Sequence, residues 1–278
     1  MFWYFVIVVL ILGIILGLYA RFVGAKGLII KEYLVESDIP KNFDGLKIVH
    51  ISDLHYGRTT LEKEMKNLVN KVNMLNPDIV VLTGDTLDEH LEASAEDKNV
   101  IIKYLNMIEA KLGKYMVSGN HDLDKKYFGD ITTDGGFKFL ENNYELIYFE
   151  GYEPIVIAGV SSAFDEVNIN DKLSDYGKFI EENDIKYKIL LTHEPDVVLE
   201  LKYDFDLILA GHSHNGQIRL PLVGAVVLPD KSRKYYDEHY EVNGAELFIS
   251  SGVGTSGVPL RLLNKPSINF YRIVNKTS

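Results

Sequence analysis

Seven short apolar runs constrain the fold of this chain more than any other feature of its sequence. They cover residues 46–51, 79–83, 115–118, 155–160, 188–192, 207–210 and 247–250. Each run has four to six residues and is rich in Val, Ile and Leu, which is typical of buried β-strands. Amphipathic stretches lie between several of the runs, and their spacing predicts helices over residues 61–75 and 100–112. Strands that alternate with helices predict an α/β fold.

The chain after residue 28 is predicted to form one domain. No Pro/Gly/Ser-rich linker, repeat or low-complexity tract interrupts residues 28–278. Residues 218–273 have no long helical pattern and are β-rich, so a second sheet packed on the first is the simplest architecture. The chain has 46% apolar and 25% charged residues, the balance of an ordinary globular protein with a core of normal size.

An uncharged apolar segment covers residues 2–20, with Trp3, Tyr4 and Tyr19 near its two ends. As a helix it comes close to the bilayer core thickness of about 30 Å, and aromatic residues at both ends are typical of membrane interfaces. A buried core helix would show a polar face. A cleaved signal peptide would have a basic start and a small-residue cleavage site. We therefore expect residues 1–27 to be an uncleaved anchor with a short linker, in contact with the lipid bilayer.

Basic residues follow the apolar segment and none precedes it. They are Arg21, Lys26 and Lys31. By the positive-inside rule, this distribution predicts a single-pass protein of the cell membrane with its domain on the cytoplasmic side.

Composition excludes several classes of function. The chain has no cysteine, which excludes disulfides, thiolate metal sites, iron–sulfur clusters and a cysteine nucleophile. The net charge of −11 argues against a broad basic surface, so we expect no nucleic-acid binding. A small anionic substrate stays compatible with this charge because bound metal ions can supply local positive charge.

Side chains that can bind metal ions follow five of the apolar runs directly. The five motifs are Asp53-Leu54-His55, Gly84-Asp85-Thr86-Leu87-Asp88, Gly119-Asn120-His121-Asp122, His193-Glu194-Pro195 and Gly211-His212-Ser213-His214. Ligand sites in open α/β sheets form at the carboxyl ends of the strands. Any one motif alone fits a turn or a structural histidine, but all five in this order predict one metal site.

The spacing within the motifs has a physical reason. Asp53 and His55 are two residues apart, so an extended chain would point both side chains to the same side. The pair His212 and His214 repeats this spacing. In three motifs a glycine stands before the candidate ligand, where the strand must break and the backbone must approach the site.

Together these motifs resemble the signature of the calcineurin-like metallophosphoesterase superfamily. The match spans residues 46–214, and the segments LKIVHISDLHYG, NPDIVVLTGD, ILLTHEPD and GHSHNGQIRLP are similar to its membrane-anchored, YkuE-type bacterial branch. The resemblance implies an αββα sandwich of two mixed β-sheets. One position departs from that branch, because Asn215 stands where a Gly is usual. Asn tolerates a left-handed backbone better than most residues, so we expect the loop to keep its shape.

The resemblance also implies two divalent metal ions per chain. The implied ligands of the first ion are Asp53, His55 and His214, those of the second are Asn120, His193 and His212, and Asp85 would contact both. Ligation by Asp, His and Asn without sulfur suits Mn, Fe, Zn, Co or Ni. Four imidazoles argue against an all-oxygen calcium or magnesium cage.

The chemistry implied by the resemblance is two-metal hydrolysis. His121, which is not among the implied ligands, would stabilise the transition-state charge or protonate the leaving oxygen. Asp122 would either hold the other ring nitrogen of His121 or cap a loop. We expect the acidic stretch at residues 88–97 to be a solvated loop that leads into the next helix. The candidates for binding the substrate phosphate are Arg58, Arg219 and Arg261. The alternative for each is a solvated surface residue.

The sequence thus predicts a metal-dependent phosphoric ester hydrolase acting on phosphodiester, pyrophosphate or phosphomonoester bonds. About seven residues join the anchor to the domain and reach about 25 Å at most, which favours a phosphorylated lipid or lipid-linked sugar as substrate. The enzymatic alternatives are a broad-specificity phosphodiesterase acting on soluble substrates and a protein phosphatase. The non-enzymatic alternative is a metal-binding scaffold, which would be expected to have lost ligands that this chain retains.

Overall fold

The computed structural model describes residues 1–277, and its strands over this range form two six-stranded sheets and one hairpin. The first sheet contains, in spatial order, β1 (Ile29–Ser37), β14 (Ser267–Asn275), β2 (Leu46–Ile51), β3 (Ile79–Thr83), β4 (Gly113–Val117) and β5 (Lys138–Phe139). The second contains β12 (His239–Val242), β13 (Ala245–Ile249), β9 (Leu207–Ala210), β8 (Lys188–Leu191), β7 (Ile155–Gly159) and β6 (Asn143–Ile147). Both sheets combine parallel and antiparallel pairs. The hairpin is β10 (Arg219–Leu220) with β11 (Gly224–Ala225).

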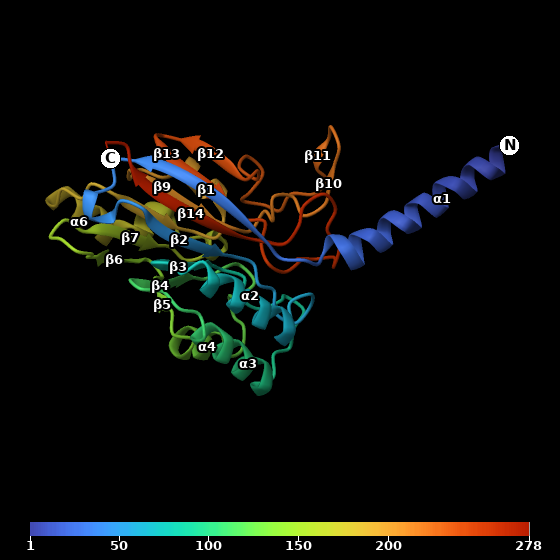
Figure 1. Ribbon diagram of the computed structural model, residues 1–278, viewed down its shortest axis with the longest axis horizontal. Coiled ribbons are helices and arrows are strands. Elements are labelled where there is room, and N and C mark those ends of the chain that lie inside the picture. Colours follow the sequence, from blue (N-terminus) through green and yellow to red (C-terminus); the bar gives the residue numbers. More distant parts are fainter. Residues whose placement is uncertain (278) are drawn as a thin grey trace.

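The two sheets pack face to face and helices cover their outer faces (Figure 1). The layer between the sheets is apolar, with Ile48 and Val81 from the first sheet in one cluster with Ile157 and Leu209 from the second. The outer face of the first sheet packs against α2 (Glu62–Met74), α3 (Ala95–Asn106) and α4 (Phe128–Asp134). The outer face of the second packs against α5 (Ile169–Lys172) and α6 (Ser174–Glu182). This arrangement confirms the αββα sandwich of two mixed sheets.

The continuous apolar runs follow from burial on both faces of each sheet. In β2, Leu46 and Ile48 point into the layer between the sheets, whereas Val49 and Ile51 pack against the helices. A strand covered on both faces has no polar alternation, which is why these runs stand out in the sequence. The expected strands at residues 46–51, 79–83 and 207–210 have the bounds of β2, β3 and β9.

The helix expected over residues 100–112 starts and ends earlier in the chain, because α3 begins at Ala95 and ends at Asn106. Its start is fixed by Ser94, whose side-chain oxygen accepts a hydrogen bond from the Asp97 backbone N–H at 3.1 Å. The Asp97 carboxylate accepts in return from the Ser94 backbone N–H at 2.9 Å. This reciprocal cap stabilises the first turn, so residues 95–97 belong to the helix and not to the preceding loop.

The N-terminal helix projects away from the sandwich (Figure 1). It consists of α1 (Phe2–Tyr19) and a π-helical turn η1 (Ala20–Gly24), and the 23-residue segment Phe2–Gly24 contains an 18-residue window with a mean hydropathy of 2.7 that is almost entirely exposed. By length and composition this segment is able to cross a membrane. Only its base contacts the domain, where the Arg261 backbone N–H donates to the Ala20 carbonyl at 3.1 Å.

Short 3-10 turns complete the described chain. They are η2 (Lys41–Phe43), η3 (Ala163–Asp165) and η4 (Pro195–Leu199). The last of these begins two residues after His193 with Pro195, whose fixed backbone angle suits the first position of a helical turn.

Candidate metal centre

Two buried clusters of Asp and His side chains lie at the carboxyl ends of the central strands. Asp53, His55 and His214 form the first cluster, and their potential donor atoms lie within 4.8 Å of one another. The second cluster meets the same limit and consists of Asp85, His193 and His212. These residues follow β2, β3, β8 and β9, so strands of both sheets contribute to the site. The structure therefore brings together six of the seven ligands implied by the motifs.

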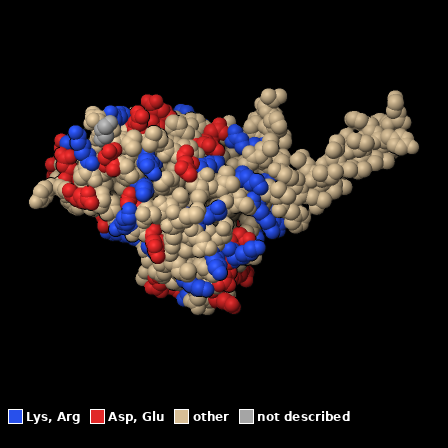
Figure 2. Space-filling model, in the orientation of Figure 1, with Lys and Arg blue, Asp and Glu red and all other residues tan. Residues whose placement is uncertain are grey.

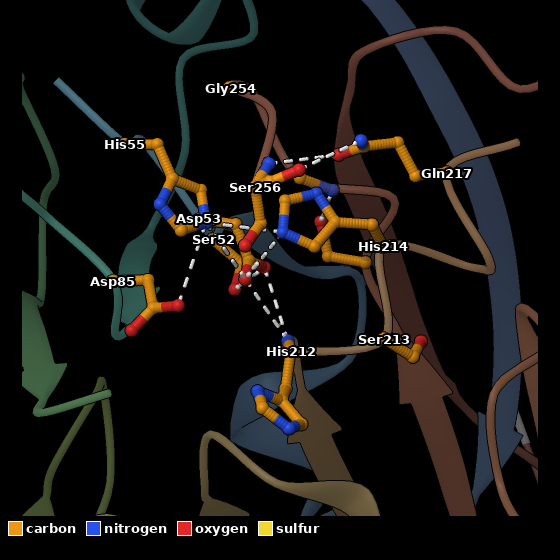
Figure 3. Close-up of polar contacts among 12 residues, drawn as sticks. Ser52, Asp53, His55, Asp85, His212, Ser213, His214, Gln217, Gly254 and Ser256 are labelled. Carbon is orange, nitrogen blue, oxygen red and sulfur yellow. Dashed lines mark hydrogen bonds and ion pairs between the residues drawn. The ribbon is translucent and has the colours of Figure 1, made fainter. Parts of the chain in front are cut away.

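Asp85 lies between the two clusters. Its Oδ2 is 3.5 Å from Nε2 of His55 in the first cluster and 3.2 Å from Nε2 of His193 in the second. Within the first cluster, Oδ1 of Asp53 lies 3.3 Å from Nε2 of His214. Figure 3 shows Asp85 directed at His55, with Asp53 between the rings of the first cluster. One carboxylate that faces two groups of donors is the arrangement required to contact two ions.

The candidate ligands approach one another through left-handed backbone and not through an extended chain. The φ angles are +51° at Asp53, +42° at His55, +65° at His212 and +50° at His214. The extended geometry expected for these pairs is therefore wrong, although the side chains do meet. Non-glycine residues seldom adopt positive φ, and strained backbone of this kind concentrates at functional sites.

Glycine permits close approach of the backbone at two places. A Cβ at Gly119 would lie 2.3 Å from Oδ1 of Asp85, and a Cβ at Gly84 would lie 2.5 Å from the Gly119 nitrogen. Only glycine fits at such distances. The unusual Asn215 adopts φ +47°, and its amide donates to the Ile249 carbonyl at 3.1 Å, so the loop keeps its shape without the usual glycine.

Hydrogen bonds on the far side of two imidazoles orient them for metal binding. Nδ1 of His193 lies 2.7 Å from the Thr83 carbonyl, and Nε2 of His212 lies 2.8 Å from the Asp230 carbonyl. A ring nitrogen that faces a carbonyl carries the proton, which leaves the lone pair on the nitrogen that faces the cluster.

Two atoms of the site that could ligate a metal are buried without a hydrogen bond of good geometry. Within residues 1–277, Oδ1 of Asn120 has no hydrogen bond, and Nε2 of His193 has none of good geometry although Oδ2 of Asp85 lies 3.2 Å away. A buried unpaired polar atom is costly, and a divalent cation would satisfy both atoms. The donor set therefore fits metal ions, and Asn120 lines the same cavity as Asp85 and His214.

Burial controls the protonation of the metal-free cluster. It raises the pKa of Asp53 to about 7 and lowers the pKa of His55 to about 4. It also lowers the pKa of His214 well below its ordinary value. At His193 burial opposes protonation, but the adjacent Asp85 carboxylate raises the pKa well above the ordinary value. Neutral imidazole is the form that binds metal, so burial keeps His55 and His214 in the binding state.

His121 lies at the wall of the site with Glu89 and not Asp122 beside it. Its Nε2 is 3.7 Å from Oδ2 of Asp85, and its Nδ1 is 3.6 Å from Oε2 of Glu89. The Asp122 carboxylate instead accepts backbone hydrogen bonds from Thr86 at 2.8 Å and Gly119 at 3.0 Å. Of the two roles open to Asp122, the structure shows the loop cap. Glu89 belongs to the stretch expected to be solvated loop, and its type and position gave no signal of this contact.

A cavity of about 500 Å³ opens beside the two clusters. Its polar side includes Asp85, Asn120 and His121, and its apolar side is lined by Phe164, Ile218, Val226, Val227 and Val258. The sequence predicted none of this apolar wall. Phe164 stacks edge-on against His212, with ring centroids 5.7 Å apart.

The three arginines proposed to grip phosphate lie outside this cavity. Arg261 is fully buried, and its guanidinium donates to the Ser251 and Gly254 carbonyls at 2.6 Å each. Arg58 pairs with Asp88 at 3.1 Å, and Arg219 pairs with Asp237 at 2.7 Å. Across the part of the chain that the structure describes, none of the three lines the cavity. Their expected contact with a substrate phosphate has no support in these positions.

Comparison with known proteins agrees with the fold and the geometry. The family model for calcineurin-like phosphoesterases matches residues 46–216. The chain is 31% identical to the uncharacterized metallophosphoesterase YkuE of Bacillus subtilis (strain 168), over 92% of this chain and 88% of that protein. It is 29% identical to an uncharacterized metallophosphoesterase of Aquifex aeolicus (strain VF5), over 95% and 98%. It is 28% identical to a transmembrane protein with metallophosphoesterase domain of Danio rerio, over 83% of this chain and 53% of that protein. The match over most of the domain shows that this chain belongs to the calcineurin-like phosphoesterases and is a metal-dependent phosphoesterase.

Proposed function

We propose that residues 1–27 anchor the chain in a membrane and that residues 28–278 form its phosphoesterase domain. Asp53, His55 and His214 of the first cluster would hold one divalent ion. Asn120, His193 and His212 would hold a second, and Asp85 would contribute to both sites. The observation that carries the proposal is the position of Asp85, whose Oδ2 lies 3.5 Å from His55 and 3.2 Å from His193.

Divalent ions bound there would polarise the phosphoryl oxygens and lower the pKa of water at the site. The chain contributes rigid orientation, because Thr83 fixes the ring of His193 and Asp230 fixes the ring of His212. Both rings are buried, so their hydrogen bonds are not exchanged with solvent. Electrostatic interactions are stronger in such a water-poor site than in bulk water.

His121 acts on the leaving group. Its side chain is 16% exposed and lines the cavity, whereas the imidazoles of both clusters are buried. A leaving oxygen bound beside Asp85 lies within reach of Nε2, which can donate a proton to it or stabilise its charge. Glu89, 3.6 Å from the other ring nitrogen, holds the imidazole in this direction.

The proposed substrate class is a phosphorylated lipid or a lipid-linked sugar phosphate. The base of the anchor is docked on the domain, where Ala20 and Ala25 are buried, so the site stays close to the bilayer. A substrate confined to the same bilayer gains effective concentration at the site. Arg21, Lys26 and Lys31 favour the cytoplasmic face by the positive-inside rule.

Hydrolysis of two model esters tests the proposal. The full chain in phospholipid nanodiscs is assayed with bis-p-nitrophenyl phosphate and p-nitrophenyl phosphate, with Mn²⁺ and then with a chelator. We expect hydrolysis with metal, its loss with chelator, and none for Asp85→Asn. Bound metal without hydrolysis of either ester would contradict the proposed site and favour a scaffold. Release of the chain from membranes by an alkaline carbonate wash would contradict the anchor alone.

A further inference from the structure

An apolar hairpin projects from the domain next to the N-terminal helix. It comprises residues 220–228 around β10 and β11, and we call it the finger. Neither the finger nor Pro229 after it contributes a charged residue to the sequence. In Figure 2 the finger and α1 are two uncharged projections from the same end of the molecule. At the tip of the finger Leu222 is fully exposed and Val223 is 71% exposed.

The tip of the finger exposes apolar side chains, which is unfavourable in water. Leu222 has φ +67°, a conformation at which turns favour Gly or Asn. The chain after β11 exposes Val226 and Val227 as well, at 50% and 74%. A contiguous patch of exposed apolar side chains marks a contact surface, since burying it is favourable. The finger is therefore built to contact an apolar medium.

The finger and the anchor leave the domain from neighbouring points. At the root of the finger the Arg219 backbone N–H donates to the Leu262 carbonyl at 3.0 Å. The preceding residue, Arg261, donates its backbone N–H to the Ala20 carbonyl at the end of the anchor. One short segment thus holds both projections, which Figure 1 shows leaving the same end of the domain and diverging from each other.

Basic side chains lie at this junction. Lys265 donates to the Lys26 carbonyl at 3.1 Å, and Arg21 lies in the last helical turn of the anchor. Lys and Arg at the edge of an apolar span suit the phosphate headgroups of a bilayer. The junction therefore has the charge expected at the membrane surface, and the finger begins beside it.

The inner side of the finger belongs to the cavity of the metal centre. Val226 and Val227 line the cavity together with Ile218 at the finger root and Val258 from a neighbouring loop. Asp85 and His121 form its polar side. A ligand with a phosphate at one end and an apolar chain at the other would match both sides.

We propose that the finger inserts its tip into the bilayer leaflet that the anchor enters, so that the cavity opens at the level of the lipid headgroups. The inference rests on the proposed membrane anchoring and adds the bilayer as the partner of residues 220–228. The headgroup phosphate reaches the candidate metal centre beside His121, while the apolar part of the lipid follows Val226 and Val227 back to the bilayer.

The sequence allows a direct test in the full chain, because it has no cysteine and a single tryptophan, Trp3, in the anchor. An environment-sensitive fluorophore is attached to Leu222→Cys. The matched control is Asn243→Cys, an exposed hairpin tip with φ +52° between β12 and β13. This control lies at the end of the strands opposite to the metal centre. β13 runs parallel to β9, so the amino end of β13 beside Asn243 faces away from His212, which follows the carboxyl end of β9.

Both labelled chains are reconstituted in vesicles of phosphatidylcholine and phosphatidylglycerol with spin-labelled lipids. We expect the lipids to quench the Leu222→Cys label severalfold more than the Asn243→Cys label, and iodide in the buffer to do the reverse. Adding Val223→Asp to Leu222→Cys should restore quenching by iodide while the lipids still quench Trp3.

The two proposals fail in different ways. Trp3 quenched by lipid, with equal quenching at Leu222→Cys and Asn243→Cys, overturns the finger insertion and leaves the anchor intact. Trp3 not quenched by lipid overturns the anchor, and the finger insertion with it. A Leu222→Cys label that is shielded from iodide without lipid quenching shows that protein covers the finger, which also overturns the insertion.

Discussion

The guanidinium of Arg261 lies behind His214, with its Nη2 3.2 Å from Nδ1 of the imidazole. The same arginine donates its backbone N–H to Ala20 at the base of the anchor, and its carbonyl leaves room only for glycine at Gly24. Arg261 therefore connects the N-terminal helix to the candidate metal centre through a single residue. We propose that Arg261 packs behind His214 as a positioning residue and does not bind substrate.

Replacing Arg261 tests that role. Arg261→Met should weaken binding of the ion at His214 by about 10- to 100-fold, because the loop packed against His214 loses the guanidinium's hydrogen bonds to the Ser251 and Gly254 carbonyls. KM for a soluble phosphoester at saturating metal should not change, because the guanidinium lies outside the cavity. Metal titration and steady-state kinetics measure both quantities, with Arg219→Met as the surface control.

If Arg261→Met does not fold, Arg261→Lys keeps the charge and part of the volume. A KM that rises while metal affinity stays constant would show that Arg261 grips the substrate after all.

Glu89→Gln should lower kcat about tenfold with KM and metal content unchanged, because the carboxylate facing Nδ1 of His121 orients the ring for proton transfer. Steady-state kinetics and metal analysis check this, and Glu92→Gln, an exposed residue of the same loop, is the control.

Asp122→Asn should instead destabilise the fold by about 1–3 kcal/mol, since it disturbs buried backbone hydrogen bonds from Thr86 and Gly119. A normal kcat for Glu89→Gln, together with a low kcat for a stably folded Asp122→Asn, would show that Asp122 and not Glu89 orients His121.

Asp85→Asn should be the most damaging change at the site. It removes the charge that faces both clusters, so metal content should fall at both positions and activity should disappear. His121→Ala should lower turnover by about 10²- to 10⁴-fold with both ions retained. Metal analysis of the purified variants separates these outcomes, and an ion lost from His121→Ala would make His121 a ligand.

The sequence predicted the positions of the candidate ligands because strand burial is a local signal. Runs such as residues 79–83 are buried on both faces. Parallel strands of one sheet end at the same edge, so β2 and β3 bring Asp53 and Asp85 together, and β8 and β9 bring His193 and His212 together. The meeting of these two pairs depends on how the two sheets pack. The left-handed backbone at Asp53 and His55 could not be predicted, since neither residue type requires it. It depends on surrounding contacts that form only in the folded domain.

Other features depend on distant segments and left no pattern in the sequence. Glu89 faces His121 only because the loops after β3 and β4 fold together. Arg261 is buried behind His214 although arginine is usually exposed. The finger did have a signal, an uncharged run from Leu220 to Pro229, but an isolated apolar run looks like a strand until its exposure is known.

A buried histidine outside the metal centre should make stability depend on pH. In β2, His50 lies 2.7 Å from Oγ1 of Thr83, and burial lowers its pKa to about 3. Below its ordinary value of about 6.5, the unfolded chain takes up a proton that the folded chain does not. The free energy of unfolding should therefore fall by about 1.4 kcal/mol per pH unit between pH 6.5 and 3, with no contribution from His50 above pH 6.5.

His50→Gln removes this dependence and keeps a polar group near Thr83. Urea unfolding of both proteins at pH 7 and pH 5, in the same chelator, measures the free energy of unfolding that is lost on acidification. This loss should be smaller by about 2 kcal/mol in the variant. An equal loss in both proteins would mean that His50 takes up its proton in the folded state.

The finger predicts which substrates the enzyme prefers. Long-chain phosphatidic acid and its short-chain counterpart carry the same phosphate and differ only in the apolar part, which the wall of Val226 and Val227 would contact. In bilayers the full chain should favour the long-chain substrate by at least about tenfold in kcat/KM, because substrate and site share one surface.

Leu222→Asp combined with Val223→Asp should reduce this ratio, since two charges at the tip oppose its insertion. The ratio is measured at equal bulk concentration of substrate, with Asn243→Asp as the control. A ratio near one in the unmodified chain would mean that the anchor only localises an enzyme for soluble phosphoesters, and the metal chemistry would be unaffected.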